Sequence, residues 1–179
     1  TRSRLLPGVE PEVGEVLTEA LKAEGIAVET DLAYRSVVQG DGGVTLTIER
    51  GGTPETLTAE RLVATTGRVA NSEDLGLREF GIETDARGSI KVGADMATTR
   101  PGVWAAGDVT DRDQFVYMAA YGAKVAANNA LGLQDLRYDN GAMPWVVFTD
   151  PQVAGVGLSE VQAKAAGHDV KASVLTLDH

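Results

Sequence analysis

Apolar residues in the first third of the chain change from a helical spacing to a strand spacing. They recur every three or four positions from Val13 to Leu21, which indicates an amphipathic helix with Gly25 as its stop. They then occur in short runs and in strict alternation with polar residues, as at Val44, Leu46 and Ile48, which is typical of strands. The predicted strands are residues 26–28, 33–39, 44–49, 56–59 and 61–64, with turns at 40–43 and 51–52. We therefore expect a helix followed by a β-meander.

The middle of the chain has shorter elements and ends in a long helix rich in small residues. A brief helical turn is predicted after Asn71-Ser72, followed by short strands at 90–92 and 96–99. An apolar strand then runs from Val103 to Gly107-Asp108, and a helix is predicted from near Gln114 to a stop at Gly132. Its many alanines allow another segment to approach the helix closely.

The last part of the chain again mixes strands with a helix. Strands are predicted at 145–148, 153–157 and 170–177. Ser159 and Gln162 have the spacing of a capping box, which predicts a helix that begins there and ends before Gly167. The whole pattern predicts a mixed α/β (α+β) fold.

Composition and charge argue against several classes of protein. The net charge of −10 argues against binding to nucleic acid or to an anionic membrane. The chain has no cysteine and two histidines, which removes thiol chemistry and argues against a histidine-built metal site or triad. No apolar run is long enough to span a membrane and no leader opens the chain, so the expected location is cytoplasmic. Because Thr1 is not an initiator Met, we expect a piece of a longer protein.

The junction at Gly107-Asp108 is the strongest candidate for chemistry. A strand that ends in a carboxylate and is followed by a helix start brings an acceptor close to backbone N–H groups that lack intrahelical partners. Such a place suits a polar, electron-rich ligand whose hydroxyls donate to Asp108. The dipeptide alone is more typical of an ordinary turn, and the flanking strand and helix are what favour a ligand site. Asp111 and Asp113 could bind a metal, but carboxylates before a helix are more often helix caps. Tyr117 and Tyr121 are expected to be packing residues rather than reactive phenols.

Three stretches resemble motifs of the FAD-dependent pyridine nucleotide–disulfide oxidoreductases. Residues 99–108, which end in Trp-Ala-Ala-Gly-Asp, resemble the second flavin-contacting motif of that family. Residues 62–71 are similar to its strand-end motif between the NAD(P) and central domains, and residues 145–160 to the opening of its dimerisation domain. Within the family, residues 111–117 and Thr176-Leu177-Asp178 are most similar to mercuric reductases. Dihydrolipoyl dehydrogenases are the alternative.

The resemblance implies a fragment of the flavoprotein reductase fold, which has two dinucleotide-binding domains, plus the start of an α+β dimerisation domain. Its segments would be the end of the NAD(P)-binding domain with the meander (1–66), a central FAD-contacting segment (67–140) and the truncated dimerisation domain (141–179). The parent would be a homodimer through the last of these. Neither the Gly-x-Gly-x-x-Gly turns nor the redox cysteines of the family have a counterpart here, so the fragment alone is expected to be inactive.

The resemblance also implies roles for individual residues. Asp108, after Gly107, would bind the ribityl hydroxyls of FAD. Amides near the helix start would face the pyrimidine edge of the flavin, and Gly67 would lie against the nicotinamide nucleotide unless it is a plain loop glycine. Two arginines would meet the 2′-phosphate of NADPH unless they are simply solvated. The helix-start residues are Gln114, Phe115 and Val116, and the arginines are Arg2 and Arg4.

The resemblance implies a redox reaction for the parent enzyme. Hydride would pass from NAD(P)H to FAD, then to a cysteine pair, and two electrons would reduce Hg(II) to Hg(0). In the alternative enzyme the substrate would be a disulfide. A third hypothesis, from a different class, is an interaction or dimerisation module without a cofactor.

Overall fold

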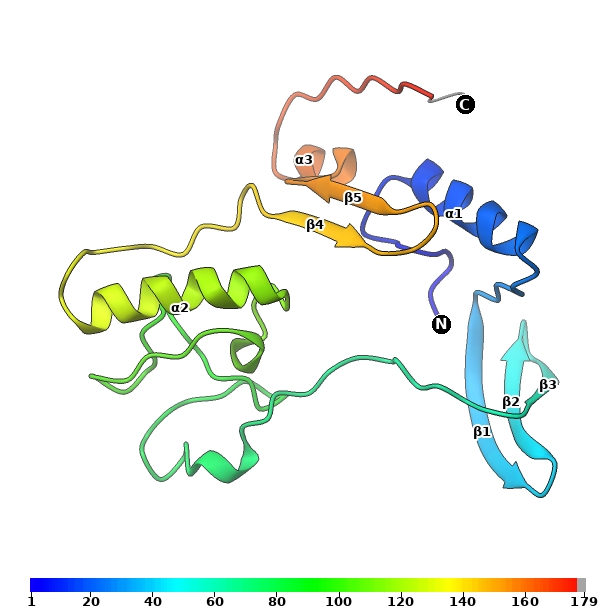
Figure 1. Ribbon diagram of the computed structural model, residues 1–179, viewed down its shortest axis with the longest axis horizontal. Coiled ribbons are helices and arrows are strands. Elements are labelled where there is room, and N and C mark those ends of the chain that lie inside the picture. Colours follow the sequence, from blue (N-terminus) through cyan, green and yellow to red (C-terminus); the bar gives the residue numbers. More distant parts are fainter. Residues whose placement is uncertain (177–179) are drawn as a thin grey trace. The chain divides into compact units, whose positions relative to one another are not determined.

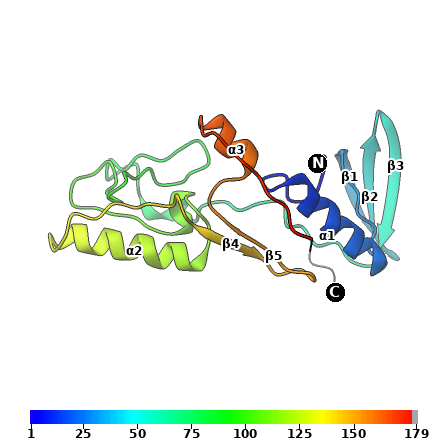
Figure 2. The ribbon, with the colours of Figure 1, turned by 90° about the horizontal axis from the view of Figure 1, so that it is seen from above.

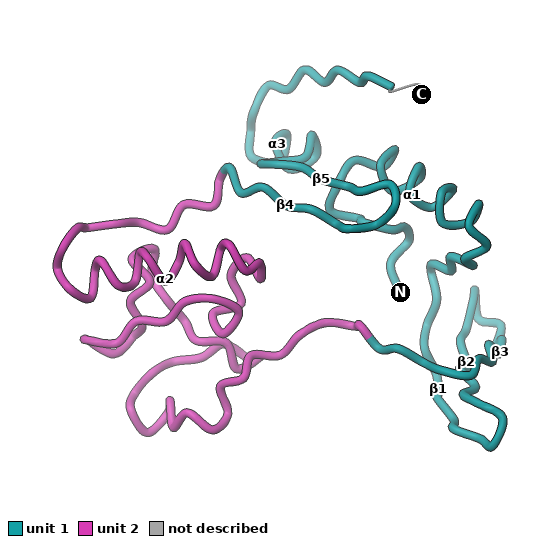
Figure 3. The backbone as a smooth tube through the Cα atoms, viewed as in Figure 1, with its two compact units in different colours: residues 1–64, 142–179 teal, residues 65–141 magenta. Residues whose placement is uncertain are grey.

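A computed structural model describes residues 1–176 and divides the chain into two compact units. Unit 1 consists of residues 1–64 and 142–179, and unit 2 of residues 65–141 (Figure 3). The end of the last predicted strand, the resemblance at Leu177-Asp178 and the terminal His179 lie outside the described residues. The functional assignment of the three predicted segments stays a prediction.

Unit 1 opens with helix α1, Pro11–Ala23, as the apolar spacing predicts (Figure 1). Pro11 occupies the first turn, where its missing N–H costs nothing, and Leu17 is buried at 3% exposure. Gly25 adopts φ 86° after the last turn, and its N–H donates to the carbonyl of Lys22. This left-handed stop is the one that the sequence predicts.

The meander forms as an antiparallel three-stranded sheet in the order β1-β2-β3 (Figures 1 and 2). Its strands are β1 Leu32–Gly40, β2 Gly43–Arg50 and β3 Thr53–Ala59. Ile48, in the central strand, is fully buried. The strands predicted at 26–28 and 61–64 do not form, because no described strand lies beside them to complete a ladder. Val63 is 80% exposed as a result.

A second hairpin and a short helix complete unit 1. Strands β4, Pro144–Val147, and β5, Val153–Val156, pair antiparallel, with Trp145 opposite Gly155. A Cβ at Gly155 would lie 2.5 Å from the Trp145 ring, so the indole packs directly on the glycine. Helix α3, Glu160–Ala165, follows the predicted capping box at Ser159. Residues 170–176 do not form the last predicted strand.

Unit 2 is built around helix α2, Val116–Ala130, which ends before Gly132 as predicted. The helix packs closely because Gly122 faces the unit: a Cβ there would lie 3.3 Å from the Tyr138 ring and 3.5 Å from Ala106 and Met96. Met96 itself is 1% exposed. The small-residue density of the helix therefore serves packing within unit 2.

Two 3₁₀ turns and three isolated bridges replace the remaining predicted elements of unit 2. The turns are η1, Glu73–Leu75, which is the predicted helical turn, and η2, Asp108–Thr110. The strands predicted at 90–92, 96–99 and before Gly107 are wrong, because turns interrupt each run before a ladder can extend. The bridges are Thr84 with Ile90, Val92 with Thr98, and Ala97 with Trp104. Among the residues described, no helix is long and apolar enough to cross a membrane.

Candidate functional site

Gly107 places the Asp108 side chain on the surface of unit 2. Its φ of 82° and ψ of −162° belong to a region that only glycine adopts readily. The hydroxyl of buried Thr110 donates to the Gly107 carbonyl at 2.8 Å, and the Asp111 N–H donates to the Asp108 carbonyl at 3.1 Å. These bonds close η2, so the Asp108 backbone is fixed while its carboxylate points outward.

The Asp108 carboxylate retains its capacity to accept hydrogen bonds. Its side chain is 57% exposed, and an Arg68 guanidinium nitrogen lies 3.7 Å from Oδ2. At this distance the two groups form an ion pair, but they are too far apart for a hydrogen bond. Within residues 1–176 no donor forms a hydrogen bond to this carboxylate, so hydroxyls of a ligand can do so.

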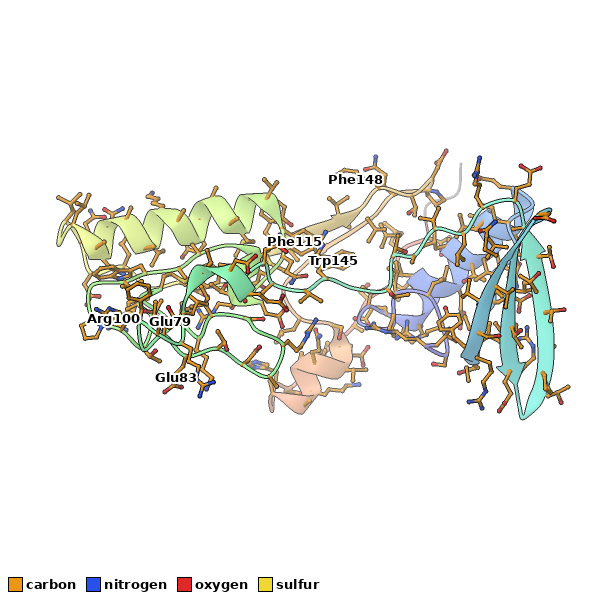
Figure 4. All side chains as sticks on the ribbon, turned by 90° about the horizontal axis from the view of Figure 1, so that it is seen from below. Glu79, Glu83, Arg100, Phe115, Trp145 and Phe148 are labelled. Atoms are coloured by element: carbon orange, nitrogen blue, oxygen red, sulfur yellow. The ribbon has the colours of Figure 1, made fainter. Side chains whose placement is uncertain are left out.

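Helix α2 begins shortly after this turn, and the Phe115 N–H there already donates to the Asp113 carbonyl at 2.6 Å. Phe115 is the N-cap residue, with φ −123°, and no side chain caps the helix there. Val116 is 85% exposed, and the Phe115 ring stacks on Tyr117 with 5.4 Å between centroids (Figure 4 labels Phe115 at the helix start). Asp111 and Asp113 are therefore not caps of this helix, contrary to the interpretation from sequence.

The residues predicted to bind cofactors in unit 2 line two neighbouring clefts rather than one. A cleft of about 460 Å³ joins Asp108 and Gln114. Its other lining residues are Arg68, Val69, Ala70, Asn71 and Val109. A second cleft, of about 590 Å³, contains Gly67 together with Arg68 and Arg87. Gly67 has φ 130° and nothing within 4 Å of a Cβ, so its backbone is open to approach.

A closed ring of hydrogen bonds, which we call the Arg87 ring, links the two loops that line these clefts. The Arg68 guanidinium donates to the backbone carbonyl of Gln114 at 3.0 Å. The side-chain amide of Gln114 donates to Asp111 Oδ1 at 3.0 Å. Arg87 completes the ring by donating to Asp111 Oδ2 at 3.0 Å and to the Arg68 carbonyl at 3.1 Å. Sequence reasoning did not assign a role to either arginine, and their separation along the chain from Asp108 and Asp111 gives no local signal.

Arg87 sits in a turn that its neighbours hold in shape. The Asp85 carboxylate accepts from the N–H groups of Arg87 at 2.8 Å and Ser89 at 2.9 Å. The Ser72 hydroxyl donates to the Gly88 carbonyl at 2.5 Å. The N–H donors of Ser89 and Arg87 lower the pKa of the Asp85 carboxyl below its ordinary value of 3.8, because they stabilise the ionised form.

This lowered pKa predicts a pH dependence of the stability of unit 2. The folded state holds the Asp85 proton less tightly than the unfolded chain, so the stabilisation is present above pH 3.8 and is lost as the pH falls through the lowered pKa. We expect Asp85→Ala to lower the urea midpoint at neutral pH, with a difference from wild type that narrows in acid. The exposed Asp169→Ala variant is the control. A difference that stays constant across this pH range would contradict the prediction.

The segment after α2 is tied to the start of that helix. Asp113 Oδ2 accepts from the Tyr138 hydroxyl at 3.0 Å and from the Asn140 amide at 2.8 Å. Burial, with the Asp113 carboxylate beside it, raises the pKa of the Tyr138 phenol, which therefore stays protonated as a donor. The Tyr121 ring packs against Tyr138 with 5.1 Å between centroids, as expected for a packing residue.

Arg2 and Arg4 lie in unit 1. The Arg4 guanidinium donates to the carbonyls of Pro7 at 3.0 Å and Val9 at 2.9 Å, and so holds the loop before α1. The Arg2 side chain is exposed. Contact of either arginine with a nucleotide phosphate stays a prediction.

Two family models match the chain. The model described as "Pyridine nucleotide-disulphide oxidoreductase" matches residues 1–127, and the model of the dimerisation domain of the same family matches residues 143–179. The first match covers more than half of the chain.

The similar proteins agree with these matches. Mercuric reductases of Staphylococcus aureus and Bacillus cereus are 40% identical over 98% of this chain, which spans 32% and 28% of their lengths. A dihydrolipoyl dehydrogenase of Bacillus subtilis is 34% identical over 94% of the chain and 36% of its own length. The chain thus spans about a third of the length of the curated relatives.

Solved structures share the fold. The HOCl-induced flavoprotein disulfide reductase RclA of Escherichia coli matches with a TM-score of 0.82 at 24% identity, over 94% of this chain and 38% of that one. LpdA of Mycobacterium tuberculosis matches with a TM-score of 0.82 at 27% identity, over 92% and 35%. The predicted fold class, a fragment of the flavoprotein reductase fold with the start of its dimerisation domain, is confirmed. The chain belongs to the pyridine nucleotide-disulphide oxidoreductase family.

Proposed function

We propose that this chain is part of an FAD-dependent NAD(P)H oxidoreductase, a mercuric reductase that reduces Hg(II) to Hg(0). The observation that carries the proposal is the similarity to five mercuric reductases. They are 36% to 40% identical over at least 98% of the chain. The cytoplasmic location expected from the sequence belongs to the same proposal.

The residues of unit 2 fit one side of a flavin site. Asp108 offers an exposed carboxylate with unused acceptor capacity, which suits the ribityl hydroxyls of FAD. The uncapped start of α2 offers amides and the positive end of the helix dipole, which suits the pyrimidine edge of the flavin. In this proposal amides near Gln114, Phe115 and Val116 face that edge, and Gly107 allows the flavin to approach the backbone beside Asp108. FAD, when bound, supplies the hydride-accepting ring.

The nicotinamide nucleotide is assigned to the loop at Gly67. Its open backbone in the larger cleft supports a close approach of the nucleotide, because no side chain stands in the way. Arg2 and Arg4 are proposed for the 2′-phosphate of NADPH. The hydrogen bonds that Arg4 already makes to loop carbonyls leave Arg2 as the more available of the two.

The parent protein is proposed to be a homodimer through the segment that the dimerisation-domain model matches. The chain has no cysteine, so the sulfur that would relay electrons to Hg(II) must come from other parts of the parent. The fragment by itself is proposed to be inactive.

A dihydrolipoyl dehydrogenase-like disulfide reductase is the second candidate. Its support is the pair of dihydrolipoyl dehydrogenases that are 34% and 36% identical over 94% of the chain. A cofactor-free interaction module is the remaining alternative.

The full-length parent protein tests these candidates in one assay. We expect a purified protein with visible flavin absorbance that consumes NADPH on addition of Hg(II) and releases volatile Hg(0). Consumption of NADH or NADPH on addition of a disulfide such as lipoamide, and none on addition of Hg(II), would favour the second candidate. A full-length protein that takes up no flavin would favour the interaction module.

A further inference from the structure

Arg87 bonds to both loops that line the proposed cofactor clefts. One guanidinium nitrogen donates to Asp111 at 3.0 Å and the other to the Arg68 carbonyl at 3.1 Å. The first acceptor belongs to the loop that carries Asp108 and leads to α2. The second belongs to the loop that carries Gly67.

The turn that carries Arg87 is preformed, so the guanidinium is presented from a fixed base. Asp85 accepts from two N–H groups of the turn, and Gly88 adopts φ 83°. The opposite end of the ring is also fixed, because Arg68 donates to the Gln114 carbonyl and Gln114 donates to Asp111. Each of the two loops is therefore held by Arg87 and by Arg68.

We propose that Arg87 is a positioning residue for the flavin site, which acts by holding the Asp108 loop in register with the Gly67 loop through the Arg87 ring. This inference rests on the proposed function, since it takes the clefts to hold FAD and a nicotinamide nucleotide. Arg87 lines the larger cleft, but its proposed effect on FAD is indirect and comes from its bonds to the two loops. It restricts the movement of Asp108 and of the α2 start, which lowers the ordering cost of binding FAD.

The two bonds of Arg87 suit an arginine better than a lysine. The planar guanidinium serves two acceptors on different segments at the same time, whereas a lysine has one ammonium on a flexible stem. Arg87→Lys should therefore retain the attraction to Asp111 and lose the bond to the Arg68 carbonyl. Both Arg87 and Asp111 are partly solvated, with side chains 61% and 30% exposed, so the expected effect of each change is moderate.

The test is a double-mutant cycle on FAD binding by the full-length protein, with the dissociation constant measured by flavin fluorescence. We expect Arg87→Gln and Asp111→Asn each to raise the Kd for FAD about 5-fold, and the double variant to be no weaker than the weaker single variant. Arg87→Lys should fall between wild type and Arg87→Gln. At saturating FAD, Arg87→Gln should also change the visible circular dichroism of the bound flavin.

The matched control is Arg78→Gln, which removes an exposed arginine of the same unit whose side chain forms no hydrogen bond or ion pair with residues 1–176. Its Kd and flavin spectrum should equal those of wild type. Urea unfolding of each variant shows whether a weaker Kd reflects loss of folding, and a retained unfolding midpoint with a raised Kd supports the proposal.

The outcomes separate the two proposals. The first case is that wild type binds FAD and Asp108→Ala weakens this binding. If Arg87→Gln then leaves the Kd unchanged, or the effects of Arg87→Gln and Asp111→Asn on the free energy of binding add in the double variant, only the role of Arg87 is overturned. If wild-type full-length protein takes up no FAD, the proposed function fails and the positioning role fails with it.

Discussion

Replacing Asp108 by Ala in the full-length protein is expected to raise the Kd for FAD about 100-fold. Hydrogen bonds to an ionised acceptor contribute about 1.5–3 kcal/mol each, and the open carboxylate has room for at least one hydroxyl at each oxygen. The measurement is the flavin content after gel filtration, followed by titration of the apoprotein with FAD. The loss should exceed that of any Arg87 variant, because Asp108 is proposed to touch the cofactor directly.

Asp135→Ala is the matched control for this substitution. Its carboxylate is 80% exposed and pairs only with Arg137 at 3.5 Å among the described residues, so its removal should leave FAD binding unchanged. Asp108→Asn should give an intermediate Kd, since the amide keeps one acceptor oxygen and loses the charge. Flavin retention by Asp108→Ala equal to that of wild type would remove this residue from the site.

Gly107→Ala is expected to destabilise unit 2 by about 2–4 kcal/mol, through backbone strain and overpacking together. The φ of 82° with ψ of −162° is a conformation that a Cβ disfavours, and the added Cβ would lie 3.3 Å from Cβ of Ala119 in α2. Either the turn or the helix has to shift. The measurement is urea unfolding followed by the helical circular dichroism signal.

Gly102→Ala is the comparison variant, because it adds a Cβ at a positive φ without a close neighbour. Gly102 also has a positive φ, of 81°, but nothing lies within 4 Å of its Cβ position. It should therefore suffer strain alone and lose less stability than Gly107→Ala. Equal losses for the two variants would contradict the greater cost expected at Gly107 from its ψ of −162° and from the contact with Ala119.

The sequence predicts the elements whose cause is local. The periodicity of α1, the alternation of β2 and the Ser159 capping box each depend on neighbours a few residues away, and each is present in the structure. The short runs at 26–28 and 61–64 have the composition of strands but lack a described partner, and a strand is not stable without one. Their prediction failed because pairing is not encoded within the run.

In the candidate site, too, the sequence predicts the features with a local cause and misses those that depend on a distant partner. The turn at Gly107-Asp108 and the helix start were found from the sequence, because glycine and a following helix leave a local mark. The sequence does not predict two ion pairs of the site, Asp108 with Arg68 and Asp111 with Arg87, because each pair joins loops far apart in the chain. Surface arginines are abundant enough that no pattern distinguishes these two.

The bonds of Asp113 to Tyr138 and Asn140 determine where unit 2 can be cut. A shortened chain that stops at the end of α2 would lose the tyrosine ring that covers Gly122 and leave the Asp113 carboxylate without two of its donors. The residues after the helix therefore belong to the folding unit rather than to a linker. A version of unit 2 intended for crystallisation or for flavin titration should extend at least to Asn140, whichever domain is attached beyond it.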